Sequence, residues 1–160
     1  MSAFEINHVS VHADDLEESV TFYEDVFGME RVPSPNFEAP VEWLACGEQQ
    51  LHLFDRDVEA PAYHHFGMTV ENFEAVFEAA RERDLFANWD DSGDPGVYSL
   101  PDGAVQVYLN DPAGNLIEVN HPDVDALDES VRQYIVPRSE QFDQSGEAAE
   151  ATIGLPKRAD

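Results

Sequence analysis

Several residue types are scarce in this chain of 160 residues, and each scarcity excludes a kind of structure or site. Cys46 is the sole cysteine, so an internal disulfide and a thiolate-cluster metal site are both excluded. No apolar run reaches about 18 residues, the length that a membrane-spanning helix needs. The opening Met-Ser-Ala-Phe-Glu lacks the basic and then apolar build of a signal peptide. We therefore expect a soluble, cytoplasmic protein with no membrane partner.

Cations are scarce as well. Eight Lys and Arg stand against 34 Asp and Glu, for a net charge of −26, and Lys157 is the single lysine. A field of this sign repels nucleic acid and anionic lipid, so neither is an expected partner. Multimolar salt shrinks the Debye length to roughly 3 Å or less and removes the self-repulsion. The composition resembles that of proteins from salt-accumulating halophiles, and an acidic mesophilic protein is the alternative.

The chain is long enough for one domain of ordinary size, and we expect a single domain over residues 1–122. Past His121 the character of the sequence changes. Val124 to Ile135 has the pattern of one amphipathic helix, and Ser139 to Asp160 is polar, acidic and poor in large apolar residues. Residues 123–160 are therefore predicted to be a helix followed by a flexible acidic tail.

The hydrophobic pattern of the first third predicts a strand, a helix and then further strands. The helix starts at Leu16 after Asp15, a capping residue, and Gly28 is placed to end it. Arg31 to Pro40 is rich in proline and is predicted to be a loop. The predicted strands are Phe4 to His12, Val41 to Cys46 and Gln49 to Phe54.

The same order then recurs. Asn72 is a capping candidate for a second helix that starts at Phe73. The strands predicted around it are His65 to Val70, Val97 to Leu100, Ala104 to Asn110 and Leu116 to Asn120. His8 aligns with His65 at an offset of 57, and His52 aligns with Glu118 at an offset of 66, so the loop Asn88 to Gly96 absorbs the difference. We infer two βαβββ repeats, about 4–55 and 63–120, in an α+β protein whose paired modules form a curved mixed sheet.

Strand parity sorts the polar side chains, because successive residues of a strand point to opposite faces. His8, His52 and His65 each lie on the face opposite to their apolar neighbours. The turn Asp-Pro-Ala-Gly-Asn predicts a hairpin centred on Ala113, which places Tyr108 across from Glu118. Each repeat therefore has one apolar face for its helix and one face with histidine or glutamate.

Glu118 stands inside the apolar run Leu116 to Val119, where a carboxylate is costly unless it is paired, protonated or bound to a metal. A single strand histidine is most often a hydrogen-bonded or surface group. Here, however, the candidates occupy equivalent positions of the two repeats, which would bring four donors into one cleft: His8, His52, His65 and Glu118. Imidazoles with a carboxylate suit Fe(II), Mn(II), Ni(II), Co(II) or Zn(II). We predict a divalent metal site there.

The chain resembles the vicinal oxygen chelate superfamily, which includes glyoxalase I, bleomycin-binding proteins, fosfomycin-resistance transferases and extradiol ring-cleaving dioxygenases. The stretches that carry the resemblance are INHVSVHADDLEESVTFYEDVFGM, LHLFD, HHFGMTVENFEAVFEAA and VYLNDPAGNLIEVNHP, so it covers about residues 4–122. The resemblance implies paired βαβββ modules around a metal cleft and a substrate that chelates the ion through adjacent oxygens. It places the ligands at His8, His65 and Glu118, with His52 as a fourth ligand or an acid/base.

Within that superfamily the sequence favours extradiol ring cleavage, with a glyoxalase I-like isomerase as the alternative. The extradiol enzymes have a second-shell histidine at the place of His52 and a tyrosine ten residues before the glutamate, as Tyr108 is. Their further histidine before that tyrosine is missing, because Ser99, Leu100 and Pro101 stand there. The isomerases usually have a carboxylate or amide where this chain has His52. A metal-free binding protein of the bleomycin-resistance type is the alternative from another class, and the resemblance also implies a homodimer.

Overall fold

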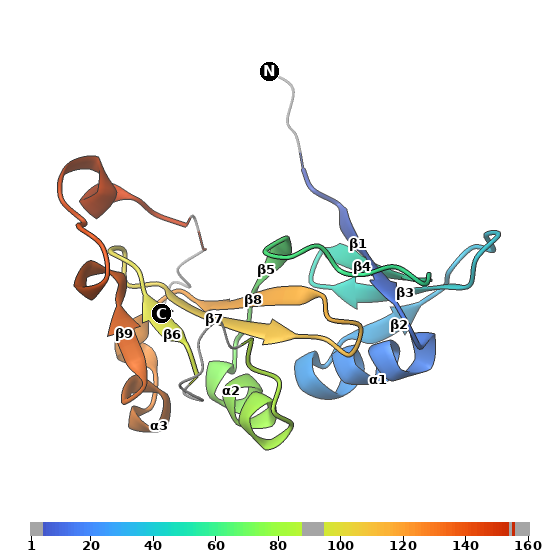
Figure 1. Ribbon diagram of the computed structural model, residues 1–160, viewed down its shortest axis with the longest axis horizontal. Helices are drawn as coiled ribbons and strands as arrows, with labels where there is room; N and C mark the ends of the chain where they lie inside the picture. Colours follow the sequence, from blue (N-terminus) through green and yellow to red (C-terminus); the bar gives the residue numbers. More distant parts are fainter. Residues whose placement is uncertain (1–4, 88–94, 154, 156–160) are drawn as a thin grey trace. The chain divides into compact units, whose positions relative to one another are not determined.

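The computed structural model describes residues 5–87, 95–153 and 155, and its fold is α+β (Figure 1). The chain divides into two compact units, residues 1–66 with 110–116 and residues 67–109 with 117–160. It forms two mixed sheets, one of four strands and one of five. The order of elements repeats as strand, helix and three strands, which confirms the α+β class and the two βαβββ modules.

The first repeat forms the four-stranded sheet, in the order β1-β4-β3-β2. Its elements are β1 (His8–Ala13), α1 (Leu16–Phe27), β2 (Glu30–Val32), β3 (Val41–Cys46) and β4 (Gln49–Asp55). The outer strand β1 runs parallel to β4 and sets Ser10 beside His52, while β3 pairs antiparallel with β4 and sets Trp43 beside the same residue. His52 thus has a neighbouring strand on each side.

Helix α1 begins and ends where the sequence predicts. The Asp15 side chain accepts a hydrogen bond from the backbone N–H of Glu18 at 3.0 Å, which satisfies one free donor of the first turn. Gly28 ends the helix in the left-handed conformation at φ 67°, where a residue with a Cβ is disfavoured. The inner face of α1 buries Val20 and Tyr23 completely.

The second repeat forms the five-stranded sheet, in the order β5-β8-β7-β6-β9. Its elements are β5 (His65–Thr69), α2 (Phe73–Glu82), β6 (Val97–Ser99), β7 (Val105–Asn110), β8 (Leu116–His121) and the later strand β9 (Ile135–Pro137). Asn72 caps α2 through a 3.0 Å bond to the N–H of Ala75. As predicted, β7 and β8 flank the Asp111–Asn115 turn, and their bounds are symmetric about Ala113.

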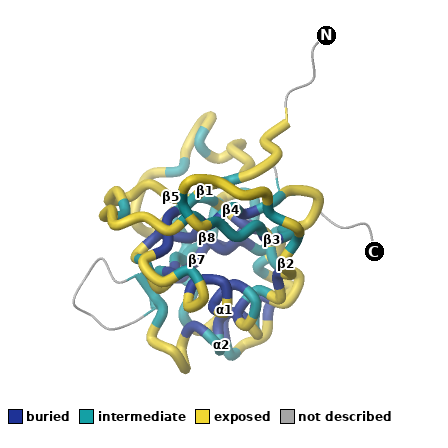
Figure 2. Tube along the Cα trace, turned by 90° about the vertical axis from the view of Figure 1, so that its right-hand side faces the viewer, coloured by how far each residue is buried: buried dark blue, intermediate teal, exposed yellow. Residues whose placement is uncertain are grey.

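The two hairpins differ in burial, which Figure 2 maps along the chain. In β4 only Leu51 and Leu53 are buried, and they alternate with half-buried residues as a two-faced strand should. In β8 every residue from Leu116 to Asn120 is buried, including Glu118 at 7% exposure. The second hairpin therefore holds its polar residues in a drier environment than the first.

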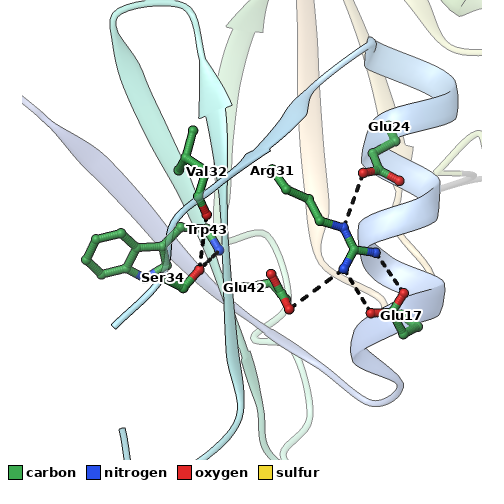
Figure 3. A network of polar contacts seen from close by, with 7 residues as sticks. All are labelled: Glu17, Glu24, Arg31, Val32, Ser34, Glu42 and Trp43. Carbon is green, nitrogen blue, oxygen red and sulfur yellow. Dashed lines mark hydrogen bonds and ion pairs between the residues drawn. The ribbon is translucent and has the colours of Figure 1, made fainter. Parts of the chain in front are cut away.

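Two predicted boundaries need correction. Arg31 to Pro40 is not entirely loop, because β2 pairs Arg31 with Leu44 of β3. Arg31 is fixed there by carboxylates of Glu17, Glu24 and Glu42, at 2.7, 3.3 and 3.7 Å, as Figure 3 shows. The first strand begins at His8 rather than near Phe4, and Phe4 itself lies outside the described residues, as do residues 88–94 of the predicted loop Asn88 to Gly96.

The segment after β8 is not the single helix that Val124 to Ile135 predicts. It forms a 3-10 turn (Val124–Ala126), the short helix α3 (Glu129–Arg132) and then β9. Asp128 interrupts it, since its backbone is extended at ψ 151° while its side chain accepts from the N–H of Ser130 and caps α3. In the tail, Arg138–Glu140 and Gly146–Glu150 are 3-10 turns. No helix within the described ranges is long and apolar enough to cross a membrane.

Candidate functional site

In the first repeat, three aromatic rings stack on the polar face of the sheet. The rings of His52 and Trp43 lie 4.1 Å apart at 5°, and those of His52 and His8 lie 4.3 Å apart at 20°. The register explains this stack, because Trp43 is directly opposite His52 on β3 and His8 stands two residues before the neighbour Ser10 on β1. His52 is thus held between two other rings.

Hydrogen bonds fix which nitrogen of each imidazole carries the proton. The Nε2 of His52 lies 2.8 Å from Oε1 of Gln50, and an amide oxygen only accepts, so Nε2 is the donor and the lone pair is on Nδ1. In His8 the assignment is reversed, because Nδ1 contacts Oδ1 of Asn7 and the lone pair is on Nε2. Burial, and then the nearby His8, lower the pKa of His52 below its ordinary value. His52 is therefore a neutral imidazole near neutral pH.

A cavity of about 1030 Å³ opens beside this stack. Its walls include Trp43, Phe37 and Phe54 as aromatic surface, with Arg56 and Glu48 as charged groups. His8 and His52 line the same cavity. Its volume lies at the upper end of the range for small-molecule sites, and a predominantly apolar wall with a few polar groups is the usual composition of such a site.

In the second repeat, Glu118 is held by two side-chain amides. Gln106 Nε2 donates to Glu118 Oε1, and Asn120 Nδ2 donates to the same oxygen at 3.0 Å. Gly67 of β5 lies alongside, where a Cβ would be 4.0 Å from Glu118 Oε2 and 3.3 Å from Asn120 Oδ1. These donors replace water and so offset the cost of burying a carboxyl group that is 7% exposed. The two amides also fix the orientation of the carboxylate.

Tyr108 shares the face of Glu118. The turn closes through a bond from the N–H of Asp111 to the carbonyl of Asn115, and the register that continues from it places Tyr108 opposite Glu118, as the sequence predicts. Burial, and then the charge of Glu118, raise the pKa of Tyr108 above its ordinary value, while Arg138 opposes the shift. Tyr108 is therefore a protonated phenol near neutral pH.

His65 is the first residue of β5 and is exposed. Its Nδ1 lies 2.8 Å from the backbone carbonyl of Tyr63, which can only accept, so the lone pair of the neutral ring is on Nε2. A carbonyl bond on one nitrogen is the arrangement that orients a metal-binding histidine through the other. Tyr63 carries the carbonyl in a left-handed backbone conformation at φ 66°.

A family model matches residues 5–119, that of the Glyoxalase/Bleomycin resistance protein/Dioxygenase superfamily. The chain belongs to this superfamily. An uncharacterized protein of Pseudomonas aeruginosa is 27% identical over 130 residues, which cover 72% of this chain and 87% of that protein. The C-terminal segment after residue 119 lies outside the family match.

Solved structures of the glyoxalase superfamily resemble the fold. Lactoylglutathione lyase from Agrobacterium tumefaciens has a TM-score of 0.53 and 27% identity, covering 75% of this chain and 95% of the lyase. The fosfomycin resistance protein FosX from Listeria monocytogenes has a TM-score of 0.60 and 11% identity, covering 78% and 96% of the two chains. That FosX structure holds Mn(II) and a dihydroxypropylphosphonic acid. An oxidase, ChaP-H2, has a TM-score of 0.60 and 24% identity, covering 76% of this chain and 97% of the oxidase.

The predicted ligands of this glyoxalase-superfamily chain fall in different parts of the structure. The first unit holds His8 and His52 together, the second unit holds Glu118, and His65 stands at the start of β5. Within either unit, no group of three or more His, Cys, Asp or Glu side chains in the described ranges is arranged to hold a metal. The donor types suit a divalent ion, since two imidazoles present Nε2 and one carboxylate is oriented by amides. The convergence of all four residues on one ion stays a prediction.

Four residues of the site were missed by sequence analysis. Trp43 could have been found, because a hairpin centred on Gly47 and Glu48 places it opposite His52 by the same argument that paired Tyr108 with Glu118. Gln106 and Asn120 share the parity of Glu118 on their strands and could also have been named. Arg138 carried no signal, since it lies between the helix predicted to end at Ile135 and the acidic stretch that starts at Ser139.

Proposed function

We propose that this protein is a divalent-metal-dependent enzyme whose substrate binds the ion through two adjacent oxygens. The residues that would hold the ion are His8, His65 and Glu118. The observation that carries the proposal is the state of Glu118, a buried carboxylate oriented by Gln106 and Asn120. The two amides offset the cost of its burial and hold it in one orientation, as a metal ligand requires. Membership of the glyoxalase superfamily, in which the FosX structure holds Mn(II), supports this role.

The ion, when bound, supplies Lewis-acid stabilisation of the negative charge that develops on the substrate oxygens. The protein's own groups then divide the remaining work. His52 has its proton on Nε2 in a bond to Gln50 and its lone pair on Nδ1, so we assign it to acid/base work beside the site rather than to the ligand set. Tyr108, protonated at neutral pH, donates a hydrogen bond to a substrate oxygen on the Glu118 face.

For the reaction we propose extradiol ring cleavage of a catechol, in which both atoms of O₂ enter the product and the ring opens beside the two hydroxyls. Each unit supports the proposal separately: the first has a neutral His52 beside an aromatic-walled cavity, and the second has Tyr108 on the face of Glu118. A flat ring fits a wall made by Trp43 and Phe37, whose rings lie 6.3 Å apart.

The test begins with metal analysis of protein purified without chelator, followed by assays with added Fe(II) in air. A panel of catechols is incubated while oxygen uptake and absorbance are recorded. We expect oxygen consumption and a yellow ring-opened product, both absent in the Glu118→Gln variant. Stoichiometric metal without any oxygen uptake would overturn ring cleavage. Absence of bound metal, together with no gain of activity on adding Fe(II), Mn(II), Ni(II), Co(II) or Zn(II), would favour the metal-free binding protein instead.

A second candidate reaction is a glyoxalase I-like isomerisation of a thiol hemithioacetal. The observation that favours it is the 27% identity to lactoylglutathione lyase from Agrobacterium tumefaciens. Here Glu118 would move the proton next to the substrate carbonyl, with His52 as its partner. The same protein incubated with Ni(II) or Zn(II) and a methylglyoxal hemithioacetal decides between the two, since thioester formation without oxygen uptake is expected for the isomerase.

We further propose a homodimer that works in the cytoplasm of a salt-accumulating cell on a small-molecule substrate. The net charge of −26 supports the salt-rich setting, because salt screens the self-repulsion of such a chain. The dimer rests on the resemblance to the vicinal oxygen chelate superfamily, whose modules often pair between chains. Light scattering at rising KCl concentration tests this. We expect one dimeric mass in multimolar salt and unfolding or dissociation at about 0.1 M, whereas a monomer at every concentration would contradict the dimer.

A further inference from the structure

The segment after the family match adds a strand to the second sheet. β9 pairs in parallel with β6, which sets Val136 opposite Tyr98 and Pro137 opposite Ser99. On its other side, β6 pairs antiparallel with β7 and sets Tyr98 opposite Gln106. Residues directly opposite each other point to one face of a sheet. Val136, Tyr98 and Gln106 therefore lie on the same face.

That face is the one that bears Glu118. Gln106 donates to Glu118, and Tyr108, two residues further along β7, shares the parity of Gln106. Arg138 follows β9 at the next position of the same parity as Val136. Its guanidinium carbon lies 3.6 Å from the centre of the Tyr98 ring, and the side chain is hydrogen-bonded to Tyr108. A row of side chains thus runs from Glu118 to a guanidinium at the sheet edge.

Arg138 differs from Arg31 and Arg81 in its surroundings. Arg31 is held by three carboxylates (Figure 3), and Arg81 lies 3.7 Å from the carboxylate of Glu78. Among the residues that the structure describes, Arg138 has no carboxylate partner: its contacts are the Tyr98 ring, Tyr108 and Oε1 of Gln141 at 2.8 Å. Among the described residues Arg56 and Arg132 also have no carboxylate partner, and Arg138 is the one of these three that contacts Tyr98 and Tyr108 on the Glu118 face.

We propose that Arg138 is a specificity-determining residue that binds a carboxylate of the substrate. This assignment rests on the proposed function, because it takes the Glu118 face as the substrate side. The planar guanidinium is stacked on Tyr98 and uses part of its edge on Gln141 and Tyr108. The remainder of its five N–H donors can hydrogen-bond to a carboxylate. The strongly negative chain repels an anionic substrate, and a local cation offsets that repulsion at the place where the anion must sit. The substrate class is then an aromatic diol acid rather than a neutral catechol.

The kinetic test compares 3,4-dihydroxybenzoate with catechol, which lacks the carboxylate. For Arg138→Gln we expect KM for 3,4-dihydroxybenzoate to rise roughly 10- to 100-fold, since a hydrogen-bonded charge is lost, with kcat changed less than about threefold. KM for catechol should change much less, because catechol has no carboxylate for Arg138 to bind, whereas loss of the hydrogen bond to Tyr108 affects both substrates alike. Arg138→Lys should recover part of the affinity, because the charge returns without the planar fork. Arg132→Gln is the matched control, an equal loss of charge on exposed helix α3.

A binding test keeps this inference separate from the proposed reaction. Chemical-shift titration of the side-chain N–H groups of arginine follows 3,4-dihydroxybenzoate and 3,4-dihydroxybenzamide, a neutral isostere, with unchanged metal content. We expect Arg138 to shift only with the acid, and Arg138→Gln to lose roughly 10-fold or more in affinity for it. If the acid binds at Arg138 in this way but is not turned over, the proposed reaction is wrong and the assignment of Arg138 as the carboxylate-binding residue still holds. Equal binding of acid and amide, or equal losses in Arg138→Gln and Arg132→Gln, would overturn the inference.

Discussion

The β3–β4 and β7–β8 hairpins occupy the same place in the two repeats, yet they hold their central polar residue by different means. In the first hairpin, His52 lies between the rings of Trp43 and His8. In the second, Glu118 accepts hydrogen bonds from Gln106 and Asn120. A neutral imidazole can be stabilised by stacking, whereas a buried carboxylate needs donors in place of water. The duplication conserved the position and changed the chemistry.

The turns of the two hairpins are also stabilised in different ways. The first closes at Gly47, which adopts φ 60°, and relies on the freedom of glycine. The second closes around the side chain of Asp111, whose two oxygens accept from the N–H groups of Ala113 and Asn115, the amide of Asn115 and the hydroxyl of Tyr23. Backbone conformation sets the geometry of one turn, and a buried carboxylate sets that of the other.

The sharpest way to separate the hairpins is to remove one polar residue from each. We expect Glu118→Gln to lower the affinity for Mn(II) at least about 100-fold, because a charged ligand is lost, and His52→Gln to lower it no more than about 10-fold. Competition with a fluorescent chelator measures both. Glu82→Gln, on the exposed end of α2, is the control. Equal losses for the two variants would make His52 a ligand and the two hairpins equivalent.

The Asp111 turn should contribute more stability than the Gly47 turn. Asp111→Ala leaves buried donors without an acceptor, among them the hydroxyl of Tyr23, and should lower the free energy of unfolding by about 3 kcal/mol. Urea unfolding at fixed salt measures this loss. Tyr23→Phe removes a single donor and should cost only about 1 kcal/mol. A smaller loss for Asp111→Ala than for Tyr23→Phe would show that the other three bonds contribute nothing.

Trp43→Ala removes one side of the ring stack and should lower the free energy of unfolding by about 1–2 kcal/mol. It also reduces the burial of His52, which is the leading cause of its lowered pKa, so the pKa should rise toward its ordinary value. NMR titration of the His52 ring measures the shift. Trp43→Phe keeps an aromatic face and should retain most of the lowering.

The consequence for stability has a definite sign. Because the folded pKa of His52 lies below its value in the unfolded chain, the unfolded state binds more protons between the two values. The contribution of His52 to the free energy of unfolding is complete above a pH of about 6.5 and falls as the pH drops toward the pKa of His52 in the folded protein. Trp43→Ala should therefore weaken the dependence of unfolding free energy on pH in that window. An unchanged dependence would mean that Trp43 does not cause the burial.

The smallest expected effect is at Gly47. Gly47→Ala forces a residue with a Cβ into φ 60° and should cost about 1 kcal/mol. The loss is backbone strain alone, since a Cβ built there meets no atom within 4 Å. Thermal unfolding measures it, and Gly47→Asn should restore part of the stability because asparagine tolerates the left-handed region. If Gly47→Ala were as costly as Asp111→Ala, the contrast between the two turns would fail.

Much of the fold followed from local sequence signals. The caps Asp15 and Asn72, the end of α1 at Gly28 and the turn around Ala113 were predicted because each depends on side chains within a few residues. The repeat itself was visible in the spacing of apolar residues. Segments whose structure depends on distant partners were missed: β2 forms where Arg31 meets carboxylates of α1 and β3, and β9 forms where the chain returns to β6.

The sequence alone determined the repeated βαβββ order, the parity of its polar residues and the pairing of Tyr108 with Glu118, because strand alternation and turn geometry are local. Only the tertiary structure decided how those residues are held. Gln106 and Asn120 hydrogen-bond to Glu118, and the ring of His52 stacks on neighbouring rings. Arg138 lies over the ring of Tyr98 because it directly follows β9, a strand that no local pattern predicted. Hydrogen bonds and ring contacts between separate strands depend on three-dimensional proximity, which a linear pattern fixes only within each strand and turn.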